Sequence, residues 1–407
     1  MRLAIDRLGH LGDGIAAGPD GPIFVPRTLP GEMVEGEVTG DRMPAPKIVA
    51  PSPDRVRPPC QHARSCGGCQ MQHASDPLVA AWKQGIVRGA LAGQGLTAPL
   101  RPILTSPPRS RRRATLSARR TKGGVLLGFH ARASDVLVPV PQCQLLAPDL
   151  IAAFPALEAL AIAGGSRKAE LALTVTQSLG GPDVAAGGGK APDATLLLEL
   201  ARIAEAHGLS RLTWNDETVA LRAAPMQRFG PALVVPPPGA FLQATLAGEA
   251  ALTSAVIEAV GAAARVADLF AGVGTFSLPL AQGAEVHAVE GEAAMLAALD
   301  KGWRQAPGLK RISTEARDLF RRPLEAEDLK GVEAVVIDPP RAGAEAQTAA
   351  LARARVPVIA ALSCNPVTFA RDARILVQAG YRLDWVQVVD QFRWSAHVEL
   401  AARLCLT

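Results

Sequence analysis

Two short motifs near the C-terminal end of the chain combine a thiol with a carboxylate. Cys364 lies in Ser363-Cys364-Asn365-Pro366, directly after an apolar stretch that predicts a strand. Asp338 opens Asp338-Pro339-Pro340-Arg341, which follows the preceding predicted strand. The two prolines stiffen this loop, because each fixes φ and removes a backbone donor. A thiol beside a rigidly held carboxylate predicts covalent, nucleophilic catalysis.

A glycine turn upstream predicts a nucleotide-type pocket. Residues 268–276 read Asp-Leu-Phe-Ala-Gly-Val-Gly-Thr-Phe and join a predicted strand to an apolar helix. Gly272 and Gly274 let the backbone turn tightly and approach a ligand. Glu290 ends the next predicted strand, where it could bind ribose hydroxyls, and Asp318 follows the third, near an adenine. This pattern favours a binding site for S-adenosylmethionine. The alternatives are that residues 268–276 form an ordinary strand-to-helix turn and that Glu290 is an ordinary surface acid.

The Cys364 thiol limits which methyl acceptors fit the sequence. A nitrogen acceptor already has a lone pair, so N-methylation of a base or protein leaves Cys364 without a role. Uracil C5 is a poor nucleophile until a thiolate adds to C6, so Cys364 favours C5 methylation over a buried structural cysteine. Glu399, in His397-Val398-Glu399, has the chemistry of the base that removes the C5 proton. A solvent-facing position on a terminal strand is an equal alternative for Glu399.

Four of the six cysteines form a possible metal site. Cys60, Cys66 and Cys69 follow a C-x5-C-x2-C spacing, and Cys143 is a candidate fourth ligand. Four thiolates suit a [4Fe–4S] cluster or a structural zinc ion, and the spacing leaves both open. The spacing differs from the C-x3-C-x2-C trio of radical S-adenosylmethionine enzymes. Cys405 is expected in the core.

Charge favours a nucleic-acid partner. The net charge is only +5, but residues 99–134 contain no Asp or Glu. Clustered guanidinium groups suit a phosphate backbone. The alternative is an Arg-rich solvated surface. The basic residues of this segment are Arg101, Arg109, Arg111, Arg112, Arg113, Arg119, Arg120, Lys122 and Arg132.

Three domains are predicted from 407 residues. Residues 1–50 alternate apolar and polar positions between Gly/Pro turns, which predicts a small β-barrel. Residues 51–238 predict an α+β central domain that carries the cysteines and the basic segment, with a helix from about Asp76 to Gly93 and a mobile loop over 180–192. Residues 239–407 alternate strands and helices, which predicts an α/β, doubly wound, Rossmann-like domain. Its predicted strands are Arg265–Phe270, Glu285–Glu290, Arg311–Ala316, Ala334–Asp338, Val356–Ser363, Leu383–Val389 and His397–Leu406.

Taken together, these motifs resemble the RNA 5-methyluridine (uracil-C5) methyltransferase family over nearly the whole chain. The cysteine motif, the F-x-Q motif Phe241-Leu242-Gln243, the glycine turn and the Asp338, Cys364 and Glu399 motifs follow in family order. Residues 1–50 resemble its TRAM domain, an OB-like RNA-binding barrel. The resemblance implies a class I methyltransferase domain and S-adenosylmethionine as cofactor. It also implies a [4Fe–4S] cluster on the four cysteines rather than zinc.

The resemblance also implies residue roles. Cys364 attacks C6 and Glu399 takes the C5 proton, while Gln243 and Asp338 hold the base and the reactive end of the cofactor. Cofactor-binding positions are matched by Phe270, Gly272, Gly274, Thr275, Glu290 and Asp318. Thr245 and Thr275 stand where the family has Asn, and Arg393-Trp394-Ser395 stands where Pro-His-Thr is usual. These departures concern details of substrate contact.

The expected substrate is ribosomal RNA, specifically 23S rRNA, with transfer RNA as the alternative. A non-catalytic RNA-binding protein is disfavoured, because Cys364 and Glu399 are both present. The sequence contains no long uncharged apolar run and no signal-peptide pattern at its start. We therefore expect a cytoplasmic protein without a membrane partner, acting as a monomer.

Overall fold

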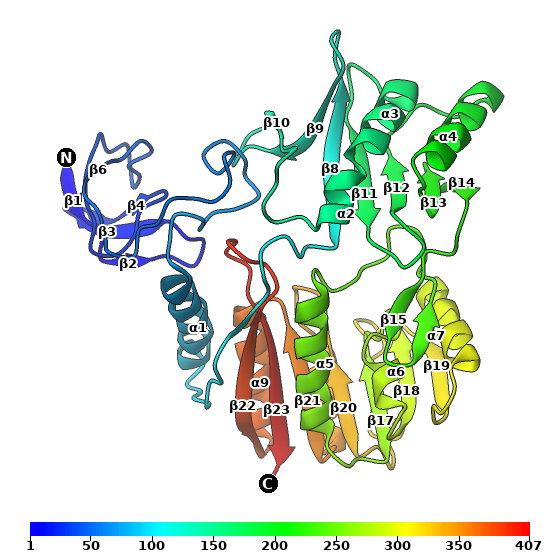
Figure 1. Cartoon of the computed structure of the whole chain (residues 1–407). Helices are drawn as coiled ribbons and strands as arrows, with labels where there is room; N and C mark the ends of the chain where they lie inside the picture. Colours follow the sequence, from blue (N-terminus) through cyan, green and yellow to red (C-terminus); the bar gives the residue numbers. More distant parts are fainter.

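The computed structural model describes residues 1–407 and contains three β-sheet regions (Figure 1). Two small antiparallel sheets, β1-β5-β6 and β2-β3-β4, form the N-terminal region. They share a core of seven side chains, among them Leu3, Ile23 and Val34, which confirms the β character expected of residues 1–50. Their strands are β1 (Arg2–Ala4), β2 (Arg7–Leu8), β3 (Gly14–Gly18), β4 (Gly21–Val25), β5 (Met33–Glu35) and β6 (Lys47–Ala50).

The middle of the chain builds a seven-stranded sheet in the order β10-β9-β8-β11-β12-β13-β14. Helices α3 and α4 cover it, and their apolar side chains join those of the strands in one core (Figure 1). The elements are β8 (Arg113–Arg120), β9 (Val125–His130), β10 (Leu137–Pro139), α2 (Pro148–Ala152), α3 (Phe154–Gly164), β11 (Leu171–Thr176), β12 (Asp183–Gly187), α4 (Ala194–Ala206), β13 (Arg211–Trp214) and β14 (Glu217–Leu221).

The prediction of a mobile loop over residues 180–192 is wrong for the middle of this range. Strand β12 lies there, paired antiparallel with β11 and parallel with β13. Its side chains Val184 and Ala186 are buried in the core of this sheet. The glycines on both sides masked a strand of five residues, which is too short to show a clear alternation.

The C-terminal part is an eight-stranded, largely parallel sheet in the order β19-β18-β17-β20-β21-β23-β22-β7. Two large apolar cores lie on its two faces, which confirms the predicted doubly wound α/β fold. Helices α5 and α7 contribute to one core, and α1, α8 and α9 to the other. No helix of the molecule combines the length and hydropathy needed to cross a bilayer.

The bounds of this sheet follow the predicted ones closely. Its strands are β7 (Leu104–Thr105), β17 (Arg265–Leu269), β18 (Glu285–Glu290), β19 (Ile312–Ala316), β20 (Ala334–Ile337), β21 (Val358–Ser363), β22 (Tyr381–Asp390) and β23 (Glu399–Leu406). Its helices are α5 (Leu246–Val260), α6 (Ser277–Leu280), α7 (Ala293–Gln305), α8 (Glu345–Ala354) and α9 (Pro366–Gln378).

Segments from the middle of the chain also pack on this sheet. The predicted helix from about Asp76 to Gly93 is confirmed as α1 (Asp76–Gly93). It lies against α9, and β7 pairs with the end of β22. The hairpin of β15 (Gln227–Phe229) and β16 (Ala232–Val234) packs on α7. Residues 51–238 therefore reach the C-terminal sheet from both of their ends. The domain boundaries at residues 50 and 238 stay predictions.

Candidate active site

Strand register places Asp338, Cys364 and Glu399 at one edge of the sheet. Asp338 follows β20 and Cys364 follows β21, two neighbouring parallel strands in which Ile337 pairs with Ala361. Ser363 pairs with Leu400 across the antiparallel strands β21 and β23. Glu399, one residue before Leu400, therefore lies beside Cys364, one residue after Ser363. The sequence alone could not make this placement.

Hydrogen bonds fix the loop of Cys364 against the loop of Asp338. The Asn365 side chain accepts from the backbone N–H of Val367 at 3.1 Å and so caps helix α9, which begins at Pro366. The same side chain donates to the carbonyl of Arg341 at 3.0 Å. Thr368 donates to that carbonyl as well, at 3.3 Å. The nucleophile and the carboxylate loop are therefore held as one unit.

Two glutamines link the buried carboxylates. The Gln243 amide nitrogen donates to Asp338 over 3.4 Å, and Gln391 donates to the Gln243 oxygen at 2.6 Å. Gln391 also donates to Glu399 at 3.1 Å, and its own oxygen accepts from the Ala244 N–H at 2.8 Å. Gln243, Gln391 and Glu399 are all buried. Gln391 was not among the predicted site residues.

Burial makes all three groups harder to ionise. Burial raises the pKa of Asp338 to about 7. Burial, together with the charge of Asp338, raises the pKa of Glu399 to about 8, against the opposing hydrogen bond from Gln391. Burial and the two carboxylates raise the pKa of Cys364 to about 11, with Arg341 opposing. With a pKa near 8, the Glu399 carboxyl group is mostly protonated at neutral pH, and the ionised fraction, which can accept a proton, grows as the pH rises.

The turn after β17 has the backbone geometry expected for a cofactor. Phe270, Gly272 and Gly274 all have positive φ, at 63°, 55° and 91°. A Cβ on Gly274 would lie 2.8 Å from Leu299, so a side chain is excluded there. The Gly272 N–H donates to Glu290 at 2.9 Å, which fastens the turn to the end of β18. A Cβ on Gly272 would meet no atom within 4 Å, so the turn faces open space.

The remaining predicted cofactor residues surround this turn. Asp318 follows β19 and accepts from the backbone N–H of Phe320 at 3.0 Å. The Phe320 ring is half exposed and lies 5.5 Å from the Phe270 ring, which the sequence did not indicate. Thr275 is half-buried in the turn before α6. Flat apolar rings beside two carboxylates are a fitting environment for an adenosyl group.

Asp268 supports the turn from below. Its carboxyl group is fully buried and accepts from the Ser277 hydroxyl at 2.6 Å, while its other oxygen has no partner. Burial raises its pKa to about 7, and the charges of Asp338 and Glu290 act in the same direction. Three carboxyl groups thus lie near one another at the ends of β17, β18 and β20.

The substrate side is a cavity of about 590 Å³ between the two large sheets. Cys364 and Glu399 line it from one side, and the loop of Gly67 and Gly68 lines it from the other. No acidic residue other than Glu399 faces it. Four guanidinium groups do, those of Arg111, Arg113, Arg341 and Arg393. A polyanion would find favourable charge at this cavity.

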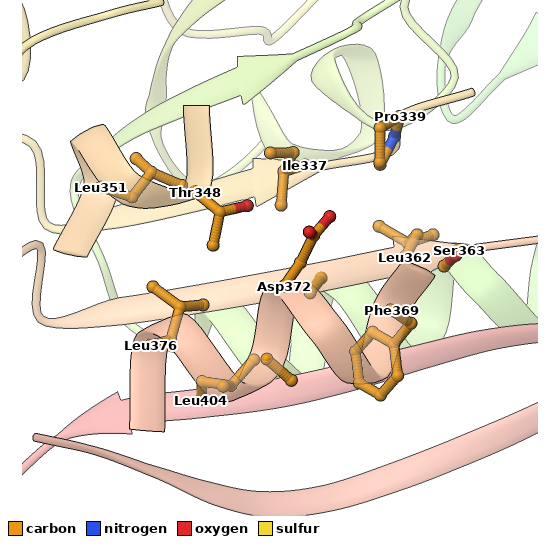
Figure 2. A pocket seen from close by; sticks show the side chains of 12 residues that line it. Ile337, Pro339, Thr348, Leu351, Leu362, Ser363, Phe369, Asp372, Leu376 and Leu404 are labelled. Atoms are coloured by element: carbon orange, nitrogen blue, oxygen red, sulfur yellow. The ribbon is translucent and has the colours of Figure 1, made fainter. Parts of the chain in front are cut away.

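A second, much smaller cavity lies behind the two reactive loops (Figure 2). It measures about 30 Å³ and is lined by Ile337, Pro339, Ser363 and Asp372, with further apolar side chains. Asp372, on α9, accepts from the Ala344 N–H at 2.9 Å and so holds the end of the 338–344 loop. This volume suits water and excludes a nucleoside. The cavity therefore belongs to the support of the site.

Arg112 corrects the reading of the basic segment. Its side chain is buried, forms an ion pair with Glu249 and donates to the Gln243 carbonyl at 3.0 Å. It is therefore not free to bind phosphate. Its alternation with Arg111 and Arg113, which line the cavity, reflects the two faces of an extended chain.

The predicted metal ligands gather beside the same cavity. Burial raises the pKa of the Cys66 and Cys143 thiols and raises that of Cys69 to about 12, and neighbouring thiols, Cys60 among them, act in the same direction on all three. Backbone N–H groups point at two of the sulfurs, Gly68 at Cys66 over 3.4 Å and Leu145 at Cys143 over 3.5 Å. No three of these thiols lie within reach of a single metal ion.

Lys83 secures the loop between β22 and β23. It extends from α1, is fully buried, and forms an ion pair with Asp390 at 2.6 Å. Its ammonium also donates to the carbonyls of Phe392, at 3.1 Å, and His397, at 2.9 Å. The sequence carried a signal for this role, because Lys83 stands between Val79 and Val87 on the buried face of the helix.

Comparison with known proteins identifies the family. A family model described as tRNA (uracil-5-)-methyltransferase matches residues 239–405. An uncharacterised RNA methyltransferase of Brucella suis is 44% identical over 99% of this chain and 97% of its own length. The 23S rRNA (uracil(1939)-C(5))-methyltransferase RlmD of Halomonas elongata is 34% identical over 98% of this chain and 88% of its own length.

A solved structure shows the same fold. The tRNA (uracil-54, C5)-methyltransferase of Pyrococcus abyssi, in complex with S-adenosyl-L-homocysteine, aligns with a TM-score of 0.77 over 99% of both chains, at 23% identity. The chain therefore belongs to the RNA uracil-C5 methyltransferase family and is an S-adenosylmethionine-dependent enzyme of that family.

Proposed function

We propose that the protein methylates C5 of a uridine in 23S rRNA through a covalent adduct on Cys364. The observation that carries the proposal is the register that sets Glu399 beside Cys364 in one cavity. A thiol with a neighbouring base is the arrangement that C5 methylation requires. N-methylation would leave this pair without a purpose.

The proposed reaction has three steps. The Cys364 thiolate bonds to C6, and the electrons of the C5–C6 double bond move toward C5 and the O4 carbonyl. Bound S-adenosylmethionine supplies a methyl group, which C5 takes as the sulfur–methyl bond breaks. Glu399 then accepts the C5 proton, the C5–C6 double bond re-forms, and the bond between C6 and the Cys364 sulfur breaks to release the thiolate.

Cofactor residues follow from the turn after β17. We assign the adenosyl group to Phe270, Gly272, Gly274, Thr275, Glu290 and Asp318, and the reactive end to Gln243 and Asp338. The support is the positive φ of the turn and the two carboxylates on neighbouring strand ends. These residues orient the cofactor and exclude water from the reacting atoms.

The choice of ribosomal over transfer RNA rests on similarity along the whole chain. The RlmD relative is described as acting on 23S rRNA, and it shares 34% identity. The tRNA-specific archaeal enzyme is only 23% identical, so it supports the fold. Residues 1–50 are proposed to be an RNA-binding TRAM barrel, which adds contact area beside the cavity.

Trapping tests the proposed chemistry. RNA carrying 5-fluorouridine at the target should form a stable adduct with the wild-type protein, because fluorine does not leave as a proton. Cys364→Ala should form none. An adduct that persists in Cys364→Ala would assign the nucleophile elsewhere. Mass spectrometry of 23S rRNA and tRNA from cells lacking the gene would identify the substrate, and a lost 5-methyluridine in tRNA alone would contradict the rRNA assignment.

The four cysteines are proposed to hold a [4Fe–4S] cluster. The residues fit, because the thiols converge and backbone N–H groups point at two sulfurs, as around cluster ligands. The resemblance of this cysteine motif to that of the family favours a cluster over zinc. Anaerobically purified protein should be brown. Colourless protein with one zinc per chain would contradict this assignment.

A further inference from the structure

Gln391 lies directly after β22, and only 1% of its surface is exposed to solvent. Its side chain reaches three residues in two other segments of the chain. These are Ala244, Gln243 in the F-x-Q motif, and Glu399 at the start of β23. No step of the proposed reaction uses Gln391.

The hydrogen bonds determine which way each amide faces. The Ala244 N–H can only donate, so the Gln391 oxygen must face it. The Gln391 NH₂ group must then face Gln243 and Glu399. Gln243 in turn has to present its oxygen to Gln391 and its NH₂ group to Asp338. One backbone donor therefore sets the orientation of both side-chain amides.

We propose that Gln391 is a positioning residue that locks the Gln243 amide with its NH₂ group on the side of Asp338, where the second N–H of that group can donate to the substrate base, and thereby selects uracil over cytosine. This inference rests on the proposed function, in which Gln243 holds the base. Uracil offers the O4 acceptor where cytosine carries an amino donor. A locked donor on Gln243 suits the first and opposes the second. A freely rotating amide would accommodate both.

Gln391 also influences the ionisation of Glu399, the proposed proton acceptor. Its N–H donates to the Glu399 carboxylate at 3.1 Å, which favours the ionised form. The other charged or titratable groups facing Glu399 are Asp338, after β20, and Cys364, after β21, with Arg341 beyond Cys364. Asp338 opposes ionisation of Glu399. Loss of the Gln391 bond should therefore raise the pKa that governs proton removal.

Two variants separate these effects. Gln391→Leu removes both donors. Gln391→Glu keeps the shape but brings a further carboxyl group beside Glu399, and a carboxyl group has at most one proton, so it cannot donate to Gln243 and Glu399 at the same time. A matched control is Gln387→Leu, since Gln387 is a buried glutamine of β22, the strand that Gln391 follows, and it donates to the carbonyls of Pro102 and Val388, away from the site. Gln391→Met replaces the leucine variant if that one fails to fold.

The experiment measures kcat/KM on target RNA with uridine or cytidine at the modified position, and the pH dependence of adduct release. In both Gln391 variants we expect the uridine-to-cytidine ratio to fall about 10- to 100-fold, the effect of one mispaired buried polar group. The pH at which release is half-maximal should rise in Gln391→Leu. Gln387→Leu should resemble the wild type in both.

Opposite results would overturn the inference. A folded Gln391→Leu protein with the wild-type ratio and pH profile would show that the residue only fills space. A control that changes as much as the Gln391 variants would lead to the same conclusion. If the wild-type protein forms no adduct with 5-fluorouridine RNA, the proposed function itself fails, and this result is recognisable before any variant is made.

Discussion

In the proposed reaction Glu399 and Cys364 act at different steps, so their variants should fail at different steps. Glu399→Gln keeps the shape of the site but cannot accept the C5 proton. Addition and methyl transfer should proceed, and a methylated adduct should accumulate on ordinary uridine RNA. Turnover should fall by about 10²- to 10⁴-fold, the usual contribution of a positioned base. Denaturing gels and mass spectrometry would detect the adduct; near-normal turnover, or no adduct, would remove Glu399 from this role.

The raised pKa of Glu399 predicts how adduct release depends on pH. Only the ionised carboxylate accepts a proton, and burial with the charge of Asp338 places its pKa at about 8. Release should therefore accelerate as pH rises through about 8 and slow below it. The adduct is formed about two pH units below this pKa, where release is slow, and samples are then shifted to a series of higher pH values. The rate of adduct release at each pH measures the dependence. A release rate that is flat across this range would show that another group takes the proton.

At the scale of elements, α1 acts on the active site through Lys83. The ammonium holds Asp390 and two carbonyls of the loop that leads into Glu399. Lys83→Met would leave Asp390 buried without a partner, so we expect a loss of about 3–5 kcal/mol in the free energy of unfolding. Denaturant titration measures it. Lys83→Met with Asp390→Asn should recover part of the loss, and no difference between single and double variants would contradict the coupling.

The sequence predicted the elements better than the connections between them. The apolar runs of the parallel strands and the glycine turn marked the ends of β17, β18, β20 and β21 to within two residues. Strand β12 escaped because glycines flank it. Gln391 and Lys83 escaped for a different reason. Their partners lie 148 and 307 residues away, and a sequence pattern reports local periodicity rather than such contacts.

At the scale of the whole molecule, the substrate cavity belongs to no single sheet. Gly67 and Gly68 come from the cysteine loop, Arg113 from the central sheet, and Cys364 and Glu399 from the C-terminal sheet. RNA that delivers a base to Cys364 must therefore pass between the sheets. Arg393 and Ser395, which differ from the residues of the usual family motif, also line this cavity, so they are positioned to contact the substrate.

The three consecutive arginines separate RNA binding from folding within this arrangement. Arg111 and Arg113 line the cavity, whereas Arg112 is buried against Glu249. Each of Arg111→Gln and Arg113→Gln should lower the slope of log K against log salt by about 0.7–0.9, the effect of one lost phosphate contact. Arg112→Met should instead leave the slope unchanged and cost about 3–5 kcal/mol of unfolding free energy, because it strands a buried carboxylate. RNA titrations at several salt concentrations, with thermal melts of the same proteins, measure both quantities. Unchanged slopes for Arg111→Gln and Arg113→Gln would mean that RNA avoids this side of the cavity. A lowered slope with unaltered stability for Arg112→Met would return Arg112 to the RNA-binding surface.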